Sequence, residues 1–105
     1  MLFHVTITHD AAHCPGFHRD LLPRAIDSLH NLHATADKFG VKVHGLYNAL
    51  PDHLEYLVCD AESPAVLAAY LGESLPYGQA DTETHAVVEA GELLATAQAL
   101  SPDTR

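Results

Sequence analysis

The sequence predicts an α+β domain built around one antiparallel sheet, and three observations lead to that expectation. Four segments alternate apolar and polar residues with a period of two, as half-buried strands do. Two segments repeat apolar residues at three- and four-residue spacing, as amphipathic helices do. Turn and cap residues separate these segments. At 105 residues, of which 48% are hydrophobic, the chain has room for one packed core. We expect one domain over residues 1–100 and a frayed tail over 101–105.

The first half of the chain is expected to form a strand, a loop and one long helix. Apolar and polar residues alternate through the strand, residues 2–8. A Pro-Gly pair at 15–16 marks a turn in the loop that follows. An apolar stripe then runs over residues 17–39. The regular helix should start near Leu22, because a proline follows it and suits the first turn, and Gly40 is a natural stop.

The second half is expected to repeat the pattern and to add a terminal helix. Ser63 followed by Pro64 is typical of a helix start, since a cap residue precedes a first-turn proline. The expected elements are strands over 41–50, 53–59 and 84–89, a helix over 63–72, a loop over 75–82 and a helix over 91–100. The order βαββαβ is that of the ferredoxin-like fold, in which the strand order is 4-1-3-2 and both main helices cover one face.

The two faces of this sheet differ in chemistry. The face that we expect under the helices carries Phe3, Val5, Ile7, Val41, Val43, Tyr47, Leu54, Tyr56, Val58, Ala86 and Val88. The face that we expect to stay open carries Leu2, His4, Thr6, Thr8, His44, Leu46, His53, Glu55, Leu57, Cys59, His85, Val87 and Glu89. The open face is too apolar to meet water alone. We therefore expect a homodimer in which two such faces meet.

Histidine is the residue that stands out, with nine in 105 residues. The loop after the first strand carries His9, His13 and Cys14. The expected fold brings His53 and His85 to the same end of the sheet. These five residues form the first candidate metal site.

A second candidate metal site lies at the opposite end of the sheet and contains His4, His44 and Cys59. Imidazole and thiolate donors suit nickel, copper or zinc, whereas calcium would need carboxylates. The spacing of the donors matches no standard zinc-finger signature, so the identity of the metal stays open. The alternative interpretation is that the loop histidines are only solvated and that Cys59 is a small core residue.

Several short stretches resemble known proteins. They are Val5-Thr-Ile-Thr-His9, Phe39-Gly-Val-Lys-Val-His44, the run from Glu55 to Pro64, and Glu83-Thr-His85-Ala-Val. The element order and the polar open face resemble the dimeric α/β-barrel superfamily, and the stretches are similar to small ferredoxin-like proteins that bind nickel. The resemblance implies a homodimer with histidine-rich metal sites near the strand ends, at His9 and His85. It also implies metal sequestration or homeostasis rather than turnover. The loop at 13–16 and the terminal helix depart from this pattern.

Two other functions are compatible with the sequence. Relatives of the barrel type include cofactor-independent or metal-dependent enzymes, of the monooxygenase or isomerase kind, that act on small molecules beside the sheet. In such an enzyme His44, His85, Glu55 or Tyr47 could act as acid or base. No nucleophile elbow, P-loop or dinucleotide fingerprint supports a specific reaction. The third possibility is an interaction module whose histidines only line an interface.

Charge and composition narrow the partners. Five basic against fourteen acidic residues give a formal charge of −9, which argues against nucleic acid and anionic membrane as partners. No apolar run approaches the ~18 residues that a membrane span needs. The N-terminus shows no secretory pattern, and two cysteines are too few for a disulfide framework. We therefore expect a cytoplasmic protein with reduced thiols.

Overall fold

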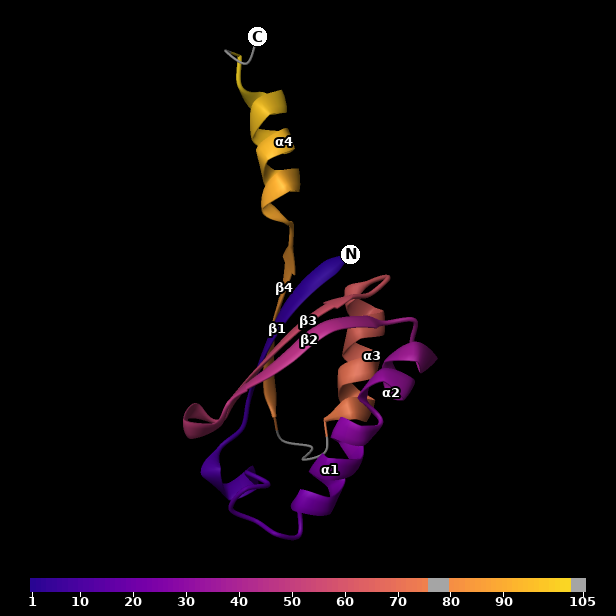
Figure 1. Cartoon of the computed structure of the whole chain (residues 1–105), viewed down its shortest axis with the longest axis vertical. Coiled ribbons are helices and arrows are strands. Elements are labelled where there is room, and N and C mark those ends of the chain that lie inside the picture. Colours follow the sequence, from indigo (N-terminus) through magenta and orange to yellow (C-terminus); the bar gives the residue numbers. More distant parts are fainter. Residues whose placement is uncertain (76–79, 103–105) are drawn as a thin grey trace.

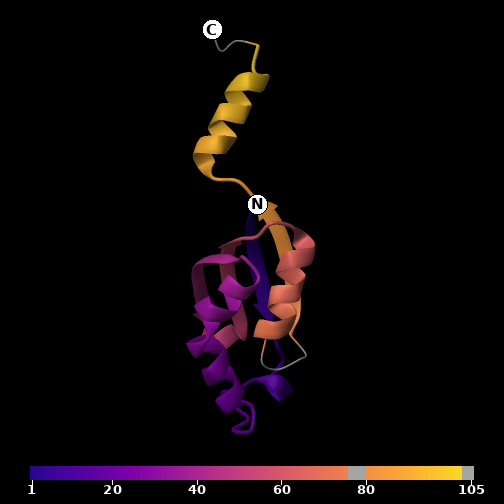
Figure 2. The same ribbon diagram turned by 90° about the vertical axis from the view of Figure 1, so that its right-hand side faces the viewer.

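The computed structural model describes residues 1–75 and 80–102 and shows an α+β protein with one four-stranded antiparallel sheet. The strands are β1 (Leu2–Thr8), β2 (Lys42–Ala49), β3 (Leu54–Asp60) and β4 (Asp81–Val87). The helices are α1 (Leu22–His30), α2 (Leu32–Lys38), α3 (Pro64–Ser74) and α4 (Ala90–Leu100), and the short 3-10 turns are η1 (Ala11–His13) and η2 (Leu50–Asp52). The sheet order is β2-β3-β1-β4, which reads 4-1-3-2 from the other edge. Helices α1, α2 and α3 lie on the same side of the sheet (Figures 1 and 2).

The core lies between the sheet and the helices. The alternating apolar residues of β1 are buried there as expected, with at most 2% of each residue exposed. Leu67, Tyr70 and Leu71 of α3 pack against them, together with Ala36 of α2. The Ser63 hydroxyl caps α3 by accepting a hydrogen bond from the Val66 backbone N–H at 3.2 Å, as its position before Pro64 predicts. The central position of β1 therefore follows from its two-sided pairing and its apolar face.

The faces predicted for β3 are wrong. In the antiparallel pair of β1 and β3, Phe3 lies opposite Cys59 and Val5 opposite Leu57. Residues directly opposite one another share a face. Leu57 and Cys59 are therefore under the helices, where both are buried. Leu54, Tyr56 and Val58, which were expected in the core, take the open face. Both sets are apolar, so alternation alone does not distinguish them.

A β-bulge explains the second error in the predicted faces. The register of β2 against β3 passes from Val43 opposite Cys59 to Gly45 opposite Val58, which leaves His44 as the extra residue. Beyond the bulge the two faces exchange. Leu46 packs against the core, and Tyr47 lies on the open face with 64% exposure. The Tyr47 ring covers Gly45 so closely that a Cβ there would lie 2.7 Å from it.

The long helix predicted over 17–39 is two helices. Asn31 interrupts it with φ −98° and ψ 10°, and its side-chain amide donates to the Asp27 carbonyl at 2.9 Å. Gly40 ends α2 with φ 67°, a left-handed conformation that glycine adopts without strain. The predicted loop over 75–82 is shortened by β4, which begins at Asp81, and its residues 76–79 lie outside the described part.

Helix α4 projects away from the sheet along the long axis of the molecule (Figures 1 and 2). All of its residues are exposed, and Leu93, Leu94 and Leu100 are 59%, 58% and 80% exposed. Of the expected tail, Ser101 and Pro102 follow the helix, and residues 103–105 lie outside the described part. Among the described residues no helix combines the length and the apolar character that crossing a membrane requires.

Candidate metal centre

Three of the predicted donors come together at one end of the sheet. His9 follows β1, Cys14 follows η1, and His53 follows η2 just before β3. One donor atom from each residue lies within 4.8 Å of the other two. The backbone N–H of His9 donates to the carbonyl of His53 at 3.3 Å, so the ends of the two strands are tied together at this point. Residues 9 and 53 are far apart in the sequence, and sheet pairing makes them neighbours.

The loop between His9 and α1 folds back on itself and carries Cys14 toward the two imidazoles. Asp10 caps η1, because its carboxylate accepts from the His13 backbone N–H at 3.0 Å. The Cys14 carbonyl accepts from the backbone N–H groups of Phe17 and His18 at 3.0 and 3.1 Å. Cys14 is partly buried and its thiol is free. These local bonds fix the backbone that presents the thiol.

His53 occupies an unusual backbone position. Its φ of 54° and ψ of 41° lie in the left-handed region, where non-glycine residues are uncommon. Its ring centroid lies 5.2 Å from that of His9 and 5.5 Å from that of Phe17, both in edge-to-face arrangements. The strained turn therefore holds the imidazole between two other rings.

Burial and charge favour the neutral form of His9. The pKa of this imidazole lies below its ordinary value of 6.5, first because burial disfavours the charged ring and then because His53 is nearby. The carboxylates of Glu55 and Asp10 oppose this shift but do not cancel it. A neutral imidazole is the form that binds a metal ion, so at neutral pH His9 is in its ligand form.

His13 and His85 of the predicted first site lie elsewhere. Nδ1 of His13 is 2.6 Å from the Asp10 carboxylate, which ties this ring to its own loop. His85 lies on the open face of β4, directly opposite His4 of β1, and its Nε2 is 2.9 Å from Glu83. Strand β4 begins at Asp81, opposite Thr8, which is earlier than predicted, so His85 lies well inside the strand and away from the end beside the centre.

The predicted grouping of His4, His44 and Cys59 is wrong. Cys59 lies under the helices, whereas His4 lies on the open face beside Tyr56, with ring centroids 5.9 Å apart. His44 is in the bulge, and its Nε2 is 2.5 Å from Asp60. Burial, with a smaller contribution from the Asp60 charge, raises the pKa of Cys59 to about 11. This thiol therefore remains protonated at neutral pH and is a poor metal ligand.

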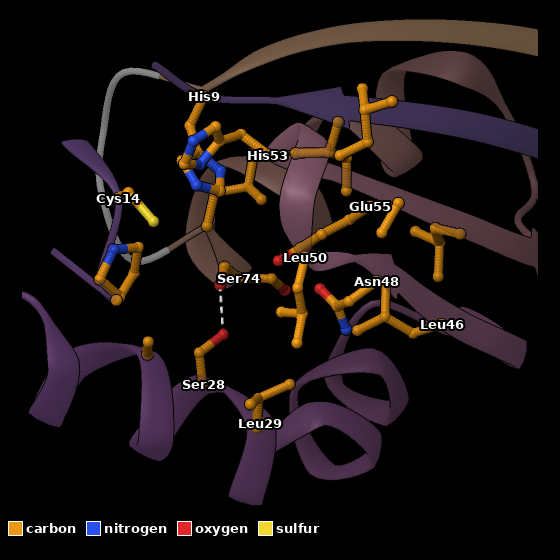
Figure 3. Close-up of a pocket in the computed structure, with 18 of the residues that line it drawn as sticks. His9, Cys14, Ser28, Leu29, Leu46, Asn48, Leu50, His53, Glu55 and Ser74 are labelled. Carbon is orange, nitrogen blue, oxygen red and sulfur yellow. Dashed lines mark hydrogen bonds between the residues drawn. The ribbon is translucent and has the colours of Figure 1, made fainter. Parts of the chain in front are cut away.

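Sequence reasoning missed a pocket of about 500 Å³ between α1 and the sheet. All three donors of the centre line one end of it, and Leu46 and Asn48 line the other (Figure 3). Leu29 of α1 lies along its wall in the same view. One feature of the sequence could have indicated this pocket, namely the well-defined apolar stripe of the first helix. Nothing in the sequence showed that this stripe would stand away from the core.

Comparison with known proteins assigns no family. No protein-family model matches the chain. A search of the curated proteins also finds no match.

Proposed function

We propose that His9, Cys14 and His53 bind one transition-metal ion and that the protein acts in metal sequestration or homeostasis. The observation that carries this proposal is the convergence of three donor atoms within 4.8 Å of one another. In a tetrahedral site with metal–ligand bonds of about 2.0–2.3 Å, donors lie roughly 3.5 Å apart. Small side-chain rotations would therefore close the group around an ion.

The donor set limits the choice of metal. Two imidazoles and one thiolate suit nickel, copper or zinc, and they suit magnesium or calcium poorly. Three protein donors also leave a fourth position for another molecule, as in catalytic zinc sites. The lowered pKa of His9 supports binding, because less proton competition has to be overcome at neutral pH.

We also propose that the chain has the ferredoxin-like fold and forms a homodimer of the dimeric α/β-barrel kind. The open sheet face supports this, because Tyr47 is exposed there next to the partly buried Tyr56 and Val58. The exposed leucines of α4 support it as well, since an isolated apolar helix gains stability only by packing. Light scattering at micromolar concentration tests the proposal, and a monomer would contradict it.

The cytoplasm is the compartment that we propose. Cys14 and Cys59 are both free thiols. Thiols persist in a reducing compartment, and a thiolate ligand at position 14 needs such conditions. Fractionation of cells that produce the untagged protein would test this assignment, and recovery outside the cytoplasm would contradict it.

The decisive experiment measures metal binding by untagged protein. Titration with nickel, copper and zinc, followed by elemental analysis, should give one ion per chain. The variants H9A, C14A and H53A should each lose affinity by at least about tenfold. The matched control is H13A, which removes a histidine of the same loop that the structure ties to Asp10, and it should bind within about threefold of the parent. Absence of binding, or equal losses in H13A and H53A, would overturn the proposal.

The pH dependence gives an independent check. Affinity should fall below about pH 6, because protonated imidazoles cannot bind a metal ion. An affinity that is constant from pH 8 to pH 5 would indicate carboxylate ligands instead.

A further inference from the structure

The metal centre and the pocket form one continuous site. The pocket lies between α1 and the covered face of the sheet, and its volume of about 500 Å³ falls in the range of small-molecule sites. His9, Cys14 and His53 are all part of its lining. In Figure 3 the two imidazoles and the thiol lie together at one end, and the pocket extends from them along α1.

The walls of the pocket are mostly apolar. Helix α1 contributes Leu22, Ala25 and Leu29 to the lining, yet it has no buried residue. Leu22 and Leu29 are 43% and 57% exposed. An amphipathic helix with a well-defined apolar side normally buries that side against its sheet. Here the space between α1 and the sheet is open, so an apolar molecule placed there would cover both walls.

A few polar groups interrupt the apolar lining. Asn48 and Glu55 are opposite one another on β2 and β3, and both line the pocket. The hydroxyls of Tyr70 and Ser74 are buried in the same lining and face each other. A few polar groups in an apolar lining serve to orient a ligand in small-molecule sites.

We propose that the pocket binds a neutral, largely apolar organic molecule whose nitrogen or sulfur donor completes the coordination of the metal. This inference rests on the proposed metal site, since the three protein donors leave one position to fill. The carboxylate of Glu55 in the lining disfavours an anionic ligand, and the positive charge of the metal ion disfavours a cationic one. The metal ion would thus hold an organic ligand in the pocket, and the protein would do more than store the ion.

The test compares imidazole with 4-phenylimidazole as ligands of the cobalt(II)-loaded protein. Both carry the same nitrogen donor, and only the second carries an apolar ring that can enter the pocket. Visible absorption of cobalt reports coordination directly. Burial of the phenyl ring should make 4-phenylimidazole bind about 10- to 100-fold more tightly than imidazole.

Two phenylalanine substitutions locate the effect. Ala25→Phe fills the pocket from α1, so it should abolish the preference for the phenyl compound and leave cobalt and imidazole affinities unchanged. Ala34→Phe is the matched control, because Ala34 is exposed on α2 and outside the lining. Circular dichroism confirms that both variants fold.

Each outcome bears on the inference. Normal cobalt binding with equal affinities for the two compounds would overturn the pocket ligand and leave the metal site intact. Failure of cobalt to bind would overturn both. A preference that emerges only when residues 89–105 are deleted would show that α4 of a second copy fills the pocket, which would also overturn the inference.

Discussion

The left-handed backbone at His53 predicts an unusual order of stability between two substitutions. His53→Ala and His53→Gly both remove the imidazole, and with it the ring contacts to His9 and Phe17. The two variants differ only in the Cβ atom. At φ 54° and ψ 41° that atom crowds the backbone, so the glycine variant should be the more stable of the two.

The magnitude follows from two opposing terms. Relief of the left-handed conformation favours glycine by roughly 1–2 kcal/mol. The greater freedom of glycine in the unfolded chain favours alanine by about 0.4–1 kcal/mol. The net expectation is that His53→Gly exceeds His53→Ala by roughly 0.5–1 kcal/mol in free energy of unfolding. For a domain of this size the difference corresponds to a Tm higher by about 4 °C.

Urea denaturation, monitored by circular dichroism, measures this difference. Linear extrapolation to zero urea gives the free energy of unfolding of each variant. The control is Ala68→Gly at an exposed position of α3, which should lower stability by about 1 kcal/mol because the helix there is regular. If His53→Ala proved as stable as His53→Gly or more so, the left-handed turn would be wrong. The position of the imidazole beside His9 would then need another explanation.

Three further results are expected. Burial raises the pKa of Cys59 from 9.0 to about 11, so this thiol should react with iodoacetamide at pH 8 at least about 100-fold more slowly in the native protein than in urea. Mass spectrometry follows the reaction, and equal rates would contradict the burial of Cys59. The hydrogen bond from His44 lowers the pKa of Asp60, so the substitution His44→Ala should raise the pKa of Asp60. NMR of the Asp60 carboxyl carbon measures this change. The stabilisation is present above pH 3.8 and is lost as the pH falls through the lowered pKa of Asp60, so the variant should be less stable than the parent at pH 6, and the difference should shrink as the pH falls below 3.8. An unchanged carboxyl titration in the variant would contradict the interaction. Deletion of residues 89–105 should weaken the proposed dimer by at least about tenfold in sedimentation experiments, and an unchanged Kd would exclude α4 from the interface.

Local chemistry made several elements predictable from the sequence. The first strand alternates cleanly, and its observed bounds are those expected. Ser63 caps α3, and Gly40 ends α2 in a left-handed conformation. Each of these features depends on the residue itself and on its neighbours within a few positions. Short-range rules therefore suffice for them.

The faces of β2 and β3 were not predictable in the same way. Val58 and Cys59 are both apolar, so the pattern of β3 fits either orientation. Its pairing with β1 decides between them, and that pairing joins residues about fifty positions apart. A single bulge at His44 then reversed the second half of β2. Because side chains alternate with a period of two, one extra residue moves every later side chain to the other face.

The same long-range effect decides which histidines meet. A register shift of one residue in the pair of β1 and β3 would send Cys59 to the open face and recreate the grouping with His4 that the sequence suggested. His9 and His53 are less sensitive to such a choice, because each stands just beyond a strand end and their backbones share a hydrogen bond. Cys14 reaches them through a short loop that its own cap residue orders. A site at strand ends thus depends on which ends are adjacent, whereas a site on a strand face depends on the register of every pair. This is why three members of the first predicted group, His9, Cys14 and His53, do lie together, while His85 on β4 and the second predicted group do not.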